Sequence, residues 1–173
     1  MEKDYLIGRL FIETAFSCMA CDGDIDSREI NLILDLHKNQ NLFLIDDAKE
    51  ALNFFVSEIN KKGELFFHDY FKFLRTAKLS KDEEIAIARI ALKIIEADEI
   101  IKYSEIKFFK IIRSKLKVSN EELIKALAEF ENIDEYLQVD ILSTNSREKL
   151  YSDYFDSHNV PQFEKISIDN MST

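Results

Sequence analysis

The stretch that decides the fold is Ala20-Cys21-Asp22-Gly23-Asp24-Ile25-Asp26-Ser27-Arg28-Glu29-Ile30. It lies between two apolar runs with helical spacing. Gly23 is expected to end the first helix, because glycine readily adopts the left-handed conformation found after helix ends. Asp26 and Glu29 have the spacing of a capping box, in which each side chain accepts from the backbone at the other position. The stretch therefore predicts a helix–turn–helix junction.

A weaker copy of this stretch begins half a chain later, at Glu96-Ala97-Asp98-Glu99-Ile100-Ile101-Lys102-Tyr103-Ser104-Glu105-Ile106. When Asp22 is aligned with Asp98, Glu29 meets Glu105, and the Asp-to-Glu interval is seven in both copies. In the second copy Glu99 replaces the glycine and Lys102 replaces Asp26. The shared register predicts two related helical halves with a pseudo-twofold internal repeat.

The repeated pattern resembles the TerB family, named for tellurite resistance, whose domain is also similar to the N-terminal module of DjlA-type co-chaperones. The family's hallmark is Ala-Asp-Gly-x-Ile-x-x-x-Glu at a helix–helix junction, present twice. The resemblance covers about residues 5–130. It implies an all-α fold and a non-enzymatic interaction or scaffold module in bacterial stress response or defence. Some members of the family are linked to divalent metal.

Composition supports the same fold class. The chain has 173 residues, of which 46% are hydrophobic, but only three glycines and one proline. Because sandwiches and barrels need many Gly- and Pro-rich turns, this scarcity favours long helices with short polar links. We expect one all-α bundle of about seven helices at 1–131 and a C-terminal extension at 132–173. Within the extension, 157–173 is expected to be an extended or mobile tail.

Helical periodicity and capping signals place the individual helices. Ser80 and Ser119 each stand three residues before a glutamate, as in a capping box. The helix that follows Ser80 is apolar nearly all round, which indicates a central position. Leu6, Leu10 and Cys18 are expected on the buried face of the first helix. The expected helices span 4–21, 26–38, 46–61, 64–78, 81–95, 103–116, 119–130 and, in the extension, 147–155.

The first junction, Asp22 to Glu29, allows two interpretations, and under one of them the protein is a divalent-cation-binding sensor. Its four carboxylates repel one another at neutral pH, so a hard divalent cation such as Ca²⁺ or Mg²⁺ would relieve the repulsion. The candidate ligands are Asp22, Asp24, Asp26 and Glu29, with Asp98 and Glu105 as the equivalents in the second copy. Alternatively these carboxylates only cap helices, and no cofactor is required. Lys102 would then supply a side-chain charge in place of an ion.

The segment 64–78 is unusually aromatic. Phe66 and Phe73 are seven residues apart and share one helical face, separate from that of Phe67 and Tyr70. One interpretation is a helix buried on two sides. The other is a protein-binding surface with exposed aromatic residues, to which Tyr154 and Phe155 of the extension would contribute.

The remaining features limit the function. A net charge of −10 with a pI near 4.9 disfavours nucleic-acid binding and favours basic protein partners. No stretch is long and apolar enough to insert into a membrane, and the start of the chain is a poor signal peptide. Cys18 and Cys21 are expected to be reduced thiols of a cytoplasmic protein. The sequence contains no recognisable catalytic or phosphate-binding motif, so we expect no enzyme. Partner identity and oligomeric state stay open.

Overall fold

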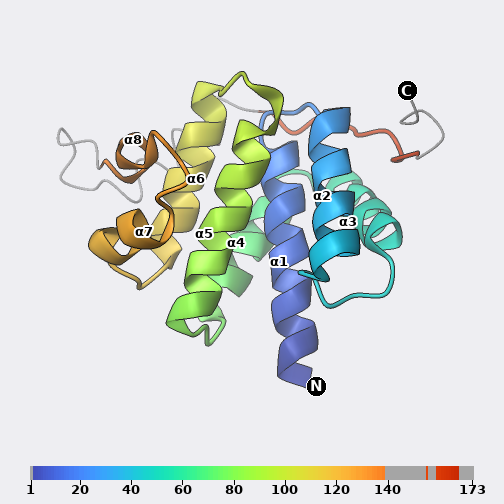
Figure 1. Ribbon diagram of the computed structural model, residues 1–173. Coiled ribbons are helices and arrows are strands. Elements are labelled where there is room, and N and C mark those ends of the chain that lie inside the picture. The colour runs from blue at the N-terminus through green and yellow to red at the C-terminus, as the bar shows by residue number, and fades with distance from the viewer. Residues whose placement is uncertain (1, 139–154, 156–158, 168–173) are drawn as a thin grey trace.

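The computed structural model describes residues 2–138, 155 and 159–167 (Figure 1). In these residues it contains eight α-helices and one 3-10 turn, and no strand. The all-α prediction is therefore confirmed. The elements are α1 Glu2–Ala20, α2 Ser27–Gln40, α3 Ala48–Lys62, α4 Glu64–Thr76, α5 Lys81–Ile95, η1 Glu96–Asp98, α6 Tyr103–Lys115, α7 Asn120–Ala126 and α8 Ile133–Leu137.

The centre of the bundle is formed by α1 and α5, which lie side by side and make the most extensive helix–helix contact (Figure 1). Every residue of α1 from Leu10 to Ala20 is buried, because other helices cover it on all sides. The prediction that 81–95 is a buried helix is confirmed. The prediction of an inward Leu6 is wrong, since its side chain lies near the uncovered start of α1 and is 44% exposed.

The predicted capping boxes are present. Asp26 begins α2, Ser80 begins α5 and Ser119 begins α7, each with a glutamate at the third helical position. Asp47 also caps α3, by accepting from the backbone N–H of Glu50. These local signals explain why the observed helix ends generally lie within one or two residues of the predicted ones. The helix predicted at 119–130 is the exception, because it ends earlier, at Ala126.

Gly8 allows a close contact between α1 and the loop that follows α2. A Cβ atom at this position would lie 2.0 Å from the carbonyl oxygen of Phe43. The Phe43 side chain is fully buried and belongs to the main core. The absence of a side chain at Gly8 therefore lets the backbone of this loop pack directly on α1.

Two parts of the C-terminal extension lie on the helical body. The short helix α8 was not predicted; it packs on α6, where the rings of Tyr136 and Phe109 are 5.5 Å apart. Residues 159–167 have no helix and run along α3 (Figure 1). The helix predicted at 147–155 falls outside the described residues, apart from Phe155. None of the described helices is long and apolar enough to cross a membrane.

Candidate functional site

The first acidic junction is a tight turn stabilised by its own carboxylates. Gly23 has a φ of +85° and donates its N–H to the carbonyl of Ala20. Asp22 accepts from the backbone N–H of Asp24 at 2.9 Å. Asp26 then caps α2, and its own N–H donates to Glu29 at 3.1 Å. Asp22, Asp26 and Glu29 therefore each accept a backbone hydrogen bond.

The second junction repeats this geometry. Glu99 stands where the first copy has Gly23 and likewise has a positive φ, of +64°. Asp98 accepts from the N–H of Ile100 at 3.0 Å, and Glu105 accepts from the N–H of Lys102 at 2.7 Å. A glutamate rarely adopts this left-handed conformation. The shared local hydrogen bonds support the alignment of the two stretches, whereas the pseudo-twofold relation of the whole halves stays a prediction.

The two junctions are joined by a pair of cationic side chains. Lys102 of the second junction donates to Asp22 of the first at 2.5 Å, and the Asp22 side chain is only 9% exposed. In the opposite direction, Arg28 donates to the backbone carbonyl of Asp98 at 3.2 Å. Arg28 also pairs with the carboxylate of Asp26. The proximity of the two junctions places a positive charge next to the carboxylates that were predicted as cation ligands.

Beneath the turns, Glu29 and Glu105 are almost fully buried, with exposed fractions of 4% and 1%. Burial raises the pKa of Glu29 to about 9, and the nearby Asp22 and Glu105 carboxylates also raise it, against the lowering effect of the Asp26 N–H. Burial likewise raises the pKa of Glu105 to about 7. At neutral pH Glu29 is consequently protonated and acts as a neutral capping residue.

The predicted cation site lacks a ligand cluster in the described part of the chain. No group of three or more His, Cys, Asp or Glu residues there has the arrangement needed to hold a metal ion. Two of the predicted ligands already pair with cationic side chains, Asp22 with Lys102 and Asp26 with Arg28. Binding of Ca²⁺ or Mg²⁺ at this junction stays a prediction.

The two cysteines lie just before the first junction, and both are buried thiols that form no disulfide. The thiol of Cys21 donates to the carbonyl of Cys18 at 3.0 Å. Burial raises the pKa of both thiols well above the usual value, as do nearby carboxylates. Such thiols remain protonated and are poor nucleophiles and metal ligands.

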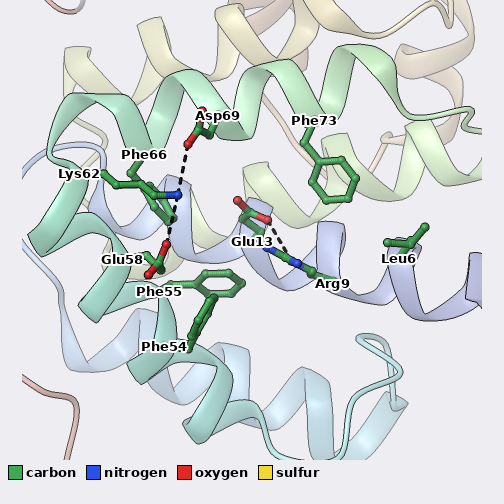
Figure 2. Close-up of a pocket in the computed structure, with 10 residues that line it drawn as sticks. All are labelled: Leu6, Arg9, Glu13, Phe54, Phe55, Glu58, Lys62, Phe66, Asp69 and Phe73. Carbon is green, nitrogen blue, oxygen red and sulfur yellow. Dashed lines mark hydrogen bonds and ion pairs between the residues drawn. The ribbon is translucent and has the colours of Figure 1, made fainter.

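A groove between α1, α3 and α4 is the second candidate site (Figure 2). Exposed apolar side chains flank it, with Leu6 on α1 at 44% exposed and Phe54 on α3 at 52%. Phe73 of α4 points into it from the opposite side (Figure 2). The lining residues are Leu6, Arg9, Glu13, Phe54, Phe55, Glu58, Lys62, Phe66, Asp69 and Phe73.

The groove contains a buried carboxylate. Glu13 is 6% exposed, and its Oε2 has no hydrogen-bond partner among the described residues. Arg9 lies 3.8 Å from this oxygen. Burial raises the pKa of Glu13 to about 7, and the charge of Arg9 opposes that shift. The charge of Lys62 also lowers the Glu13 pKa, although the Lys62 ammonium itself pairs with Glu58 at 3.1 Å and with Asp69 at 3.3 Å (Figure 2). Sequence reasoning missed Glu13, since nothing in its neighbours signals a buried acid.

The aromatic residues predicted to form one partner surface differ in burial and do not all lie in the same place. Phe66 is 4% exposed and packs against Phe16 and Phe55, so it lies on the floor of the groove. The prediction of an exposed ring at Phe66 is therefore wrong. Phe73 is half-buried in the same groove. Phe155 is half-buried and stacks on His68 with ring centroids 4.5 Å apart. Tyr154 lies outside the described residues.

Comparisons with family models, with curated proteins and with solved structures found no match for this chain. The resemblance to TerB-like domains therefore rests on the two acidic junctions and on the all-helical context.

Proposed function

We propose that the protein is a non-enzymatic, TerB-like interaction module that acts with partner proteins in cytoplasmic bacterial stress response or defence. Two features support the family assignment. The Asp22 and Asp98 turns have equivalent hydrogen bonds, and both junctions place a buried glutamate at the third position of the following helix. The contacts of Lys102 with Asp22 and of Arg28 with the Asp98 carbonyl join the two helix pairs, as is expected of a scaffold.

The observation that carries the interaction role is the groove of Figure 2. Leu6 and Phe54 expose apolar surface beside the buried carboxylate of Glu13. Exposed apolar surface next to a hydrogen-bond acceptor that lacks a donor is typical of a contact surface. The apolar stripe of a partner helix would cover Leu6 and Phe54, and a lysine or arginine on that helix would pair with the Glu13 carboxylate. The chain's net charge of −10 would attract such a basic partner.

Site-specific photocrosslinking in living bacteria tests this proposal. A photoreactive phenylalanine analogue is placed at Phe54 in the groove or, as a control, at Leu65, which is 62% exposed on α4 outside the groove. We expect a discrete crosslinked protein at position 54 only, and its loss when Glu13→Gln removes the charge. The same crosslinks at both positions, or none at position 54, would contradict the proposal.

A further inference from the structure

The C-terminal segment 159–167 is held on α3 by two asparagine side chains. Asn60 donates to the carbonyl of Phe163 at 2.9 Å and accepts from its N–H at 2.8 Å. Asn53 makes the same pair of bonds with Ile166, at 3.1 and 2.8 Å. Each amide thus satisfies both backbone groups of one residue, as a neighbouring β-strand would.

The spacing of the two asparagines matches that of an extended chain. Asn53 and Asn60 are seven residues apart on a helix, which corresponds to a rise of about 10.5 Å. Phe163 and Ile166 are three residues apart, which corresponds to about 10 Å in an extended chain. The two asparagines therefore fix the register of the bound segment through its backbone, and the segment adds one side-chain hydrogen bond, from Gln162 to the carbonyl of Asn60 at 3.1 Å.

Apolar contacts add side-chain preferences to this backbone recognition. Ile166 is 5% exposed, and Val160 and Phe163 pack half-buried against the core. Pro161 passes over the first acidic turn, where its ring carbons lie 3.5 Å from the position that a Cβ atom at Gly23 would take. All of these contacts come from one short stretch. They fit an extended peptide with a proline, an aromatic residue two positions later and a branched aliphatic residue three positions after that.

We propose that this face of α3 is a peptide-binding site for an extended segment of a partner protein, and that residues 159–167 are an internal ligand that competes for it. The asparagines recognise any backbone that can reach them, whether or not it is joined to this chain. Covalent attachment only raises the local concentration of the internal segment. Asn53 and Asn60 are not among the groove residues of Figure 2, so this site is separate from the one proposed above.

The test uses the full chain and a fluorescent peptide with the sequence of residues 159–167. Phe163→Ala with Ile166→Ala weakens the internal segment without touching α3. By fluorescence anisotropy, we expect the peptide to bind this loosened chain at least ten times more tightly than the wild-type chain. Adding Asn53→Ala and Asn60→Ala should weaken binding at least tenfold. Asn39→Ala, at an exposed asparagine on α2, should leave it unchanged.

Circular dichroism and thermal melting confirm that each variant is folded before binding is compared. The proposal is overturned if the peptide fails to bind the loosened chain, or binds equally well without Asn53 and Asn60. A scrambled peptide that binds as tightly would overturn the stated sequence preference. Sedimentation velocity shows whether a second copy of this chain occupies the site. If the wild-type chain is a dimer that the peptide dissociates, the site binds a second copy and the proposal of a partner protein is overturned.

Discussion

Replacing Glu29 with glutamine should make the protein more stable at neutral pH. The Glu29 carboxyl is 4% exposed and accepts one backbone hydrogen bond, from Asp26 at 3.1 Å. Its pKa is raised from 4.5 to about 9, chiefly by burial. Glutamine keeps the acceptor that the Asp26 N–H needs, and it cannot ionise. The substitution therefore removes the titration and leaves the capping box in place.

The expected magnitude follows from the pKa difference. Because the folded-state pKa is raised, the stabilising contribution is complete below pH 4.5 and is lost as the pH rises toward 9. Each pH unit within this window costs about 1.4 kcal/mol, since unfolding releases the proton that the folded state retains. At pH 7 the free energy of unfolding of the wild-type protein should therefore be about 3 kcal/mol lower than that of Glu29→Gln.

Urea denaturation between pH 4.5 and pH 9 measures this difference. We expect equal free energies of unfolding near pH 4.5 and a widening advantage for the variant above it. Glu122→Gln is the matched control, because Glu122 has the same position in the capping box of α7 but is partnered by Lys81, which lowers its pKa. That control should lose stability at neutral pH. A Glu29→Gln variant less stable than wild type at pH 8 would show that Glu29 is ionised when folded.

Three further predictions follow from the packing and the junctions. Gly8→Ala should lower the free energy of unfolding by about 1–3 kcal/mol in urea titrations, because the new Cβ would overlap the Phe43 carbonyl oxygen; unchanged stability would contradict the close contact. Lys102→Met should cost at most about 1 kcal/mol, with less effect at 1 M salt, because the lysine is partly exposed. Millimolar Ca²⁺ or Mg²⁺ should leave the melting temperature of wild type unchanged, because Lys102 already pairs with Asp22, and should raise that of Lys102→Met. A rise in wild type would instead support the cation-sensor interpretation, since an ion at 100 times its Kd stabilises by about 2.7 kcal/mol.

The helices could be predicted because their signals are local. Asp26 with Glu29, and Ser80 with Glu83, satisfy the first backbone N–H groups of a helix within four residues of sequence. Such contacts form wherever the helix forms, so they need no knowledge of the fold. The short helix α8 was missed for the converse reason. It has no side-chain cap, and its residues Ile133 and Tyr136 are buried by packing against the bundle.

The candidate site could be predicted only in part, because its decisive contacts join distant residues. The sequence indicated a charged side chain at Lys102 in place of an ion, and the structure places its ammonium on Asp22, 80 residues away. The contact between Arg28 and the Asp98 carbonyl had no such signal. The burial of Glu13 had no signal in the sequence either, since one glutamate in an amphipathic helix ordinarily faces solvent.

The docking of residues 159–167 left no trace in the sequence for a physical reason. Asparagine at positions 53 and 60 pairs with backbone groups, which every segment of every chain carries. A net contribution of about 1 kcal/mol for each hydrogen bond is smaller than the cost of about 1–2 kcal/mol for ordering each backbone residue. The four bonds therefore select the register but do not hold the segment by themselves. The burial of Phe163 and Ile166 has to supply the remainder, and a competing segment with better apolar residues at these two positions would replace the internal one.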